Sequence, residues 1–230
     1  MRVSWLGALG VVACGAPSVD LDPGTPEAVD TDAPEAVDTD APEVEGWSWD
    51  GSGPFAHEVV LFEPGPNAGF GQQGMPDIVL GPPLGGGDIG SYDVVSLGEE
   101  GQIVLGLGPH RLVDGPGDDL VVFENAFVGF PEWAEVGVSA DGEMWLTWPC
   151  NSTDGDGCAG NENVWSHPDN EIGPLSPDAG GDRFDLADLG IAEARFVRII
   201  DTGTNFYEGI AGGFDLDAIA LIHSTMGDEQ

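Results

Sequence analysis

From Trp47 to the C-terminus, the apolar residues of this chain come in short runs separated by Gly, Pro, Asp and Asn. No long segment repeats its apolar residues at helical spacing. Many short strands with turn residues between them are typical of a β-sandwich or a β-barrel. We therefore expect residues 47–230 to form an all-β domain, an antiparallel β-sandwich.

Two of these runs indicate how the sandwich is built. Leu120–Phe123 is apolar at four consecutive positions, which predicts a strand covered on both faces. Trp133–Ser139 alternates instead, and the turn Ala140–Gly142 after it predicts a hairpin, since Gly accepts positive φ. The candidate strands are His57–Phe62, Asp77–Leu80, Asp93–Leu97, Gln102–Leu107, Leu120–Phe123, Trp133–Ser139, Met144–Trp148, Ala194–Ile200 and Phe214–Ile222.

Charge restricts the partners of the chain. It has 42 acidic residues and five basic residues, all of them Arg, for a formal net charge of −37. Phosphate binding needs a basic face, so nucleic acid is not an expected partner. In Ala194–Ile200 the alternation places Arg195 and Arg198 on opposite faces, and in so acidic a domain we expect each to pair with a carboxylate.

The N-terminus predicts export. Arg2 precedes an apolar run, Val3–Ala13, that is shorter than the ~20 residues a membrane helix needs, so residues 1–13 indicate a signal peptide. Val11–Cys14 resembles the bacterial lipobox, which implies cleavage before Cys14 and lipid on that residue. Acyl chains would hold the protein at a membrane, and we expect it at the outer surface of the cell envelope. The alternative is an ordinary signal, a secreted protein and an incidental Cys.

Residues 14–46 predict a disordered linker. They contain the repeat PEAVDTDA at Pro26–Ala33 and again at Pro34–Ala41, with many carboxylates and neither a basic nor an aromatic residue. Such a segment buries too little apolar surface to offset its chain entropy. Proline and self-repelling charge should keep it extended, as a spacer between the anchor and the domain.

The two remaining cysteines, Cys150 and Cys158, form an even pair once Cys14 is set aside. In an oxidising compartment they should form a disulfide that closes a short loop. Free thiols or a metal site are the alternatives.

Several strings resemble known families. Ser91–Leu105, Val138–Trp145 and Ala194–Ile199, in this order, resemble the galactose-binding-like jelly roll of discoidin-type domains and many carbohydrate-binding modules. A second resemblance is to a group of bacterial cell-surface proteins without an established activity. It rests on Val94–Gly98, Gly115–Phe127, Phe184–Asp188 and Gly212–Ile219. Both resemblances imply a jelly-roll sandwich, and the second implies a location at the cell surface.

A calcium site is expected on the same basis. Asp215 and Asp217 stand two residues apart, so their carboxylates should share a face, which is costly without a cation, a proton or N–H donors between them. Related jelly rolls often hold a structural calcium near the ends of the first and last strands. The resemblance implies Asp217 as a ligand, with Asp215, Glu124, Asn125 and Asp119 as further candidates. The alternative is that these groups cap turns and accept backbone N–H bonds.

Trp165 and Tyr207 lie in the most loop-like surroundings of the large aromatic residues and are candidate contacts for a sugar ring. The chain contains no HExxH or GxSxG motif and no Gly-rich phosphate loop before a helix. Our first hypothesis is a module without enzymatic activity, lipid-anchored and calcium-stabilised, that engages a glycan or a surface protein. The alternatives are a passive coat component and a glycosidase-like hydrolase, which needs two carboxylates about 5–10 Å apart in a cleft.

Overall fold

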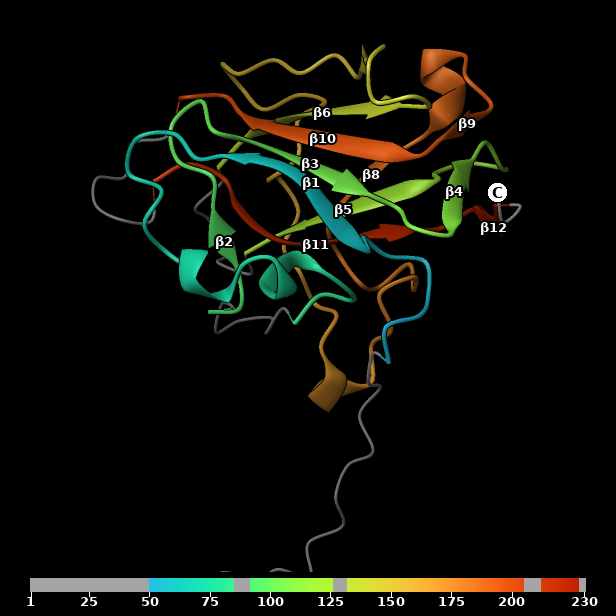
Figure 1. The fold of residues 1–230 in the computed structure, drawn as a ribbon, viewed down its shortest axis with the longest axis horizontal. Coiled ribbons are helices and arrows are strands. Elements are labelled where there is room, and N and C mark those ends of the chain that lie inside the picture. The colour runs from blue at the N-terminus through green and yellow to red at the C-terminus, as the bar shows by residue number, and fades with distance from the viewer. Residues whose placement is uncertain (1–49, 85–91, 126–131, 205–211, 228–230) are drawn as a thin grey trace, which may run out of the picture. The chain divides into compact units, whose positions relative to one another are not determined.

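A computed structural model describes residues 50–84, 92–125, 132–204 and 212–227 (Figure 1). The signal peptide, Cys14 and the linker lie outside these residues, and so does Tyr207. The described residues form three antiparallel sheets, which confirms the all-β sandwich. Short 3₁₀ helices connect some of the strands: η1 (Gln72–Gly74), η2 (Asp77–Val79), η4 (Pro168–Asn170) and η5 (Leu186–Leu189).

The two larger sheets make the layers of the sandwich. The five-stranded sheet has the order β1 (Glu58–Glu63), β3 (Gln102–Gly106), β10 (Phe196–Asp201), β6 (Ala134–Ser139) and β7 (Leu146–Thr147). The four-stranded sheet has the order β2 (Val95–Ser96), β11 (Asp215–Leu221), β5 (Leu120–Glu124) and β8 (Asp182–Phe184). A small third sheet contains β12 (Ser224–Met226), β4 (His110–Val113) and β9 (Glu193–Ala194).

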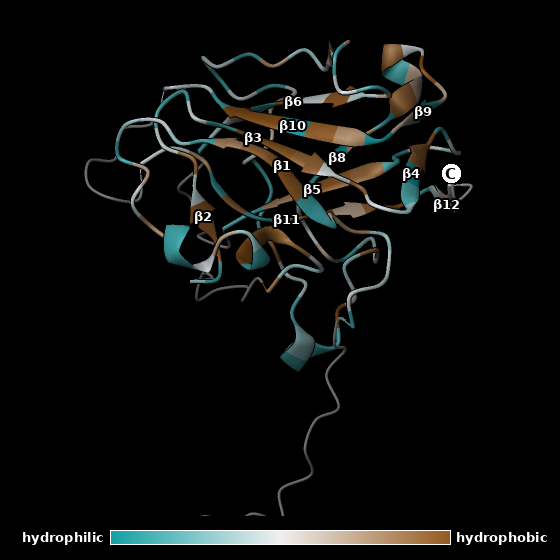
Figure 2. Ribbon diagram, viewed as in Figure 1, coloured by the Kyte–Doolittle hydropathy of each residue, from teal (hydrophilic) through white to brown (hydrophobic). Residues whose placement is uncertain are grey.

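The main core fills the space between the two layers, where both sheets turn apolar strands inward (Figure 2). Ile103, Val138 and Ile199 from one sheet pack in the same cluster as Val122 and Ile219 from the other, and all five are buried. The alternation of side chains along each strand determines which residues face the core. In β10 every second residue is buried, whereas Phe196, Arg198 and Ile200 are only partly covered.

The other face of the four-stranded sheet is also covered, as the run Leu120–Phe123 predicts. All five residues of β5 and all seven of β11 are buried. Val121, Phe123 and Ala218 form a second cluster with Phe55 and with Val164 from a long connection. Strands with two covered faces have no need to alternate, which explains their continuous apolar sequence.

The hairpin after β6 and the disulfide are both confirmed. β6 pairs with β7, and the Asp141 carboxylate holds the turn by accepting backbone N–H bonds from Glu143 and Met144, each at 2.8 Å. Gly142 has a φ of 79°, the left-handed conformation that the turn requires. Cys150 and Cys158 are disulfide-bonded, with Cα atoms 4.6 Å apart.

Three details differ from the sequence predictions. Within the predicted strand Asp77–Leu80, residues Asp77–Val79 form the 3₁₀ helix η2; Val79 is buried, and Ile78 and Leu80 pack partly buried against the main core. Strands β4, β8 and β12 were not predicted, because each is only three or four residues long and alternates weakly. Within the described part of the chain, neither Arg195 nor Arg198 forms an ion pair, and Arg198 lies instead over the ring of Trp145.

In the described residues, no helix combines the length and the apolar character that a membrane crossing requires.

Candidate functional site

Acidic side chains gather inside the sandwich where several strands begin or end. Glu124 is the last residue of β5 and lies opposite Leu216, which follows Asp215 at the start of β11. The Asn125 side-chain amide donates a hydrogen bond to Asp215 Oδ2 at 3.3 Å. Two of the predicted metal ligands, Glu124 and Asp215, are thus brought together from positions about 90 residues apart.

Two acids that were not predicted join them from the other layer. Asp201 ends β10 and lies opposite Ala134, the first residue of β6, and Glu132 stands two residues before that strand. Asp201 Oδ2 accepts the backbone N–H of Phe214, which directly precedes Asp215. This bond ties the end of one sheet to the start of the last strand of the other.

Some of these buried carboxylates are satisfied by backbone donors. Asp201 accepts N–H bonds from Glu100 at 3.0 Å, Gly203 at 2.7 Å and Phe214 at 2.8 Å. Asp182, on β8, accepts N–H bonds from Gly160, Asn161 and Glu162 through its Oδ2. Carboxylates with several N–H donors are stable as anions, and we assign these two residues to holding loops in place.

Glu124, Glu132 and Asp215 form a different group, which we call the donor-poor acids. They are only 4%, 3% and 6% exposed. Glu124 Oε1, Glu132 Oε1 and Asp215 Oδ1 are buried and find no hydrogen-bond donor among the residues that the structure describes. A buried oxygen left in this state costs free energy, and an anionic one costs more.

The pKa values of the donor-poor acids reflect this environment. Burial, followed by the charges of Asp215 and Asp201, raises the pKa of Glu132 from 4.5 to about 9. Burial, followed by the charges of Glu132 and Asp215, raises the pKa of Glu124 well above 4.5. Burial also raises the pKa of Asp215 from 3.8 to about 6, against hydrogen bonds from Ser96 and Asn125 that lower it. At neutral pH the cluster therefore needs protons or a cation.

Asp217 and Asp119 bond to other segments of the chain. Asp217 is buried at the register shift between Leu216 and Ala218, and its Oδ1 accepts the backbone N–H of Leu84 at 3.0 Å. Asp119 immediately precedes β5, whereas Glu124 ends it, so the strand separates the two carboxylates by roughly 16 Å, at about 3.3 Å per residue. One ion cannot bind both of these residues.

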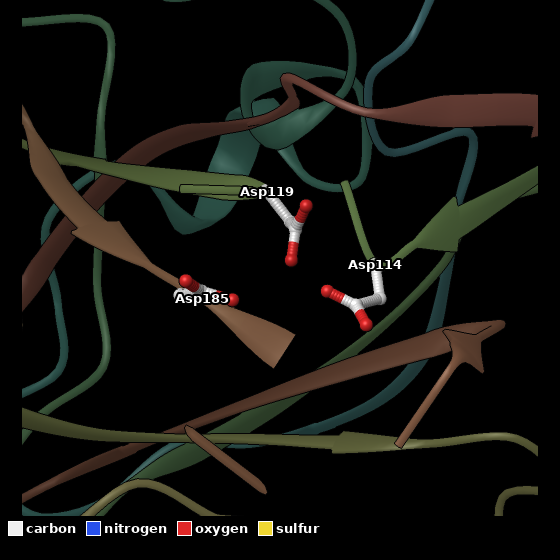
Figure 3. Close-up of side chains that lie close together, drawn as sticks. All are labelled: Asp114, Asp119 and Asp185. Carbon is white, nitrogen blue, oxygen red and sulfur yellow. The ribbon is translucent and has the colours of Figure 1, made fainter. Parts of the chain in front are cut away.

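Asp119 belongs instead to a second group of acids at the other end of β5, with Asp114 and Asp185 (Figure 3). Their carboxylates lie within 4.8 Å of one another. Asp119 Oδ1 already faces the backbone N–H of Gly115 and Nδ1 of His223, each at 2.8 Å, and Oδ2 accepts the N–H of Leu186. Asp185 caps η5. These bonds give the group a structural role in holding turns together.

The outer face of the five-stranded sheet carries a groove of about 520 Å³. Its aromatic residues are Trp145 and Phe196, and the guanidinium of Arg198 lies 4.6 Å from the ring centre of Trp145. Val60 and Leu61 from β1 add an exposed apolar strip, 52% and 37% exposed. Gln102, Asp141 and Glu143 supply polar groups at its walls.

A second cavity, of about 610 Å³, lies beside the disulfide loop. Trp148 and Phe184 form part of its wall, with ring centres 5.0 Å apart. Its carboxylates are those of Asp118, Asp154, Asp156, Glu162, Asp182, Asp185 and Asp188. Burial raises the pKa of Asp182 from 3.8 to about 6, opposed by its backbone hydrogen bonds.

The structure places Trp165, a predicted sugar contact, outside both cavities. It is half-buried in the connection after β7, where its backbone N–H and carbonyl bond to Ala179 and Asn170. Two site residues were not predicted. Asp201 could have been found from the sequence, because it follows Val197 and Ile199 at every second position of β10 and so falls on the same buried face. Glu132 belongs to no such pattern, since it precedes its strand.

No protein-family model matches the chain, and no curated protein is significantly similar to it.

Proposed function

We propose that this chain is an extracellular binding module without enzymatic activity, and that it presents the groove on the five-stranded sheet to a neutral glycan. The observation that carries the proposal is the pairing of Arg198 with Trp145 inside an open groove. In a chain with a net charge of −37, this cation has no ion pair within the described residues. Arg198 therefore keeps its donors for a ligand.

The groove has the mixed chemistry that a pyranose ring requires. One side of such a ring is apolar and packs on aromatic or aliphatic surface, here Trp145, Phe196 and the strip from β1. Its hydroxyl groups both donate and accept, which suits the guanidinium of Arg198 together with the carboxylate of Glu143. The acidic field of the whole domain repels anionic polymers, so we assign a neutral glycan.

Trp145→Ala should weaken glycan binding at least about tenfold, because aromatic anchors at the centre of a site carry much of its binding energy. The measurement is affinity electrophoresis of the full chain through gels containing neutral polysaccharides, with uronic-acid polymers as the comparison. Met144→Ala is the matched control, since Met144 is a neighbouring side chain, 75% exposed, that does not line the groove. Equal retardation of wild type and Trp145→Ala, or a preference for the uronic-acid polymers, would contradict the assignment.

The hydrolase alternative is supported by the acidic cavity beside the disulfide loop, where Asp182 has a raised pKa. A general acid must hold a proton, and the three backbone N–H groups that bond to Asp182 Oδ2 favour its anionic form. We therefore rank binding above hydrolysis. Release of reducing sugar by the wild type, lost in Asp182→Asn, would reverse this order.

We further propose a lipid anchor at Cys14, on the evidence of the sequence Val11–Cys14. Cys14→Ser should move the protein from the membrane fraction to the medium, because acyl chains provide the attachment. Immunoblotting of both fractions measures this result, and labelling with a palmitate analogue provides the control. Retention of Cys14→Ser in the membrane fraction would rule out the anchor.

A further inference from the structure

We infer that the acidic cavity beside the disulfide loop binds a linear alkyl polyamine, a small molecule that carries several ammonium groups along an apolar chain. The cavity and the groove on the five-stranded sheet share no lining residue, so this inference goes beyond glycan binding and does not depend on it. The cavity volume of about 610 Å³ lies within the range of small-molecule sites, about 300–1,000 Å³.

The cavity lies beside the outermost strands of both sheets. β7 is the last strand of the five-stranded sheet, and β8 is the last strand of the four-stranded sheet. Trp148, which directly follows β7, and Phe184 of β8 both line the cavity, with ring centres 5.0 Å apart. The Trp148 indole also donates a hydrogen bond to the backbone carbonyl of Asp185 at 3.0 Å. The two sheet edges therefore form a fixed apolar wall.

One buried carboxylate in this cavity has an oxygen that is available to a ligand. Asp182 lines the cavity and is only 8% exposed, and its Oδ2 accepts the backbone N–H groups of Gly160, Asn161 and Glu162. No hydrogen bond among the described residues reaches its Oδ1. The backbone donors favour the anion, and an anionic oxygen that is buried without a donor is costly. An ammonium group in the cavity would supply the missing donor together with a positive charge.

The other carboxylates of the cavity suit separated charges better than a single metal ion. The exposed ones belong to Asp118, Asp154, Asp156, Glu162 and Asp188. In the described chain, the trio of side chains close enough to hold a metal is Asp114, Asp119 and Asp185, and of these only Asp185 lines the cavity. Spread carboxylates match a ligand whose positive charges are also spread. The wall of Trp148 and Phe184 suits the alkyl segments between those charges.

The charge of the cavity favours a ligand with more than one positive charge. Of the residues that line it, only Arg183 is basic, and its guanidinium donates to the backbone carbonyl of Ser176 at 2.7 Å. The cavity therefore keeps a negative excess, in a chain whose net charge is −37. A cleft lined by charges of one sign raises the local concentration of the opposite ion, and each ammonium group has three donors to share among carboxylates.

The loop that carries several of these acids is held in place without a ligand. The Cys150–Cys158 disulfide closes it, and the Asn161 side-chain amide donates to the carbonyls of Gly155 and Cys158 at 2.8 and 2.9 Å. A site whose walls are already ordered loses little conformational entropy when a ligand binds. The flexible polyamine therefore accounts for most of the ordering cost.

Isothermal titration calorimetry of the full chain with spermine tests the site at pH 8, above the pKa of about 6 to which burial raises Asp182. A salt concentration of about 0.15 M screens the diffuse field of the chain. The wild type should bind one spermine per chain. Asp182→Asn should weaken binding at least about tenfold, because asparagine keeps an oxygen for the backbone donors and replaces the charged oxygen with an amide.

Two further variants make the test specific. Asp156→Asn changes an exposed side chain that lines the cavity, so it should weaken binding about two- to fivefold and remains informative if Asp182→Asn impairs folding. Glu135→Gln removes the same charge from an exposed position of β6 outside the cavity and should bind spermine as the wild type does.

Several results would overturn the inference. Binding that is unchanged in Asp182→Asn and Asp156→Asn, or equally weakened in Glu135→Gln, would show that spermine responds only to the net charge. Equally tight binding of magnesium or calcium, or tighter binding of an oligolysine peptide, would overturn the choice of a small polyamine. Trp145→Ala should bind spermine as the wild type does, so the polyamine site and the glycan groove can fail separately.

Discussion

Raising the pH of the calcium-free protein from 4.5 to about 9 is expected to lower its free energy of unfolding by roughly 5 kcal/mol. The cause is Glu132, whose pKa rises over this interval on folding, and each unit of pKa shift corresponds to about 1.4 kcal/mol. Glu124 and Asp215 shift in the same direction and add to the effect. Urea titrations in the presence of chelator, at a series of pH values, measure the effect.

The sign follows from which state holds the proton. Below pH 4.5 Glu132 is protonated in both states, and stability is at its full value. Above that pH the unfolded chain releases the proton while the folded chain retains it, so stability falls until the folded pKa near 9 is passed. Glu132→Gln should flatten the fall, because the glutamine does not titrate. Stability that is constant or rises over this range without calcium would contradict the burial of the donor-poor acids.

The second large effect is expected for Asp201→Ala, which should lower the free energy of unfolding by about 3–5 kcal/mol. The substitution removes the acceptor of three backbone N–H groups, and a buried donor left unsatisfied costs about 1–3 kcal/mol. The loss outweighs the repulsion that Asp201 exerts on Glu132, which is the smallest of the three causes of its raised pKa. Denaturant unfolding of the wild type and the variant measures this loss.

Asp201→Asn provides the matched comparison. Asparagine keeps the oxygen that can accept from Glu100 and Gly203 but offers an amide to the N–H of Phe214. Its cost should be smaller, about 1–3 kcal/mol. If Asp201→Ala unfolds within about 0.5 kcal/mol of the wild type, the division between donor-rich and donor-poor acids is wrong.

The strands that build the core could be predicted because burial leaves a pattern in their residues. Leu120–Phe123 is apolar throughout since both faces are covered, and Val197 and Ile199 alternate with half-buried neighbours since one face is covered. Segments with a single fully buried residue carry no such pattern. Val79 is that residue in η2 and Leu112 in β4, and one buried position does not distinguish a strand from a helical turn.

The site was only partly predictable, because long-range register determines it. Glu124 and Asp215 belong together through the pairing of β5 with β11, and the sequence of neither strand specifies that register. In the sequence, Asp119 and Glu124 are both polar residues at an end of the same strand. The two ends of a strand lie at opposite ends of the sheet, so these two carboxylates are far apart. Similarly, Trp145 lies in the groove because the hairpin returns the chain beside β6, where the Trp145 ring meets Arg198 of β10.

The most direct test of the proposed groove is isothermal titration calorimetry of the full chain with a neutral oligosaccharide from a polysaccharide that retards it in the gels. The groove predicts one binding site per chain, lost in Trp145→Ala and retained in Asp154→Asn, a change in the acidic cavity beside the disulfide loop. Binding that is lost in Asp154→Asn and kept in Trp145→Ala would contradict the account.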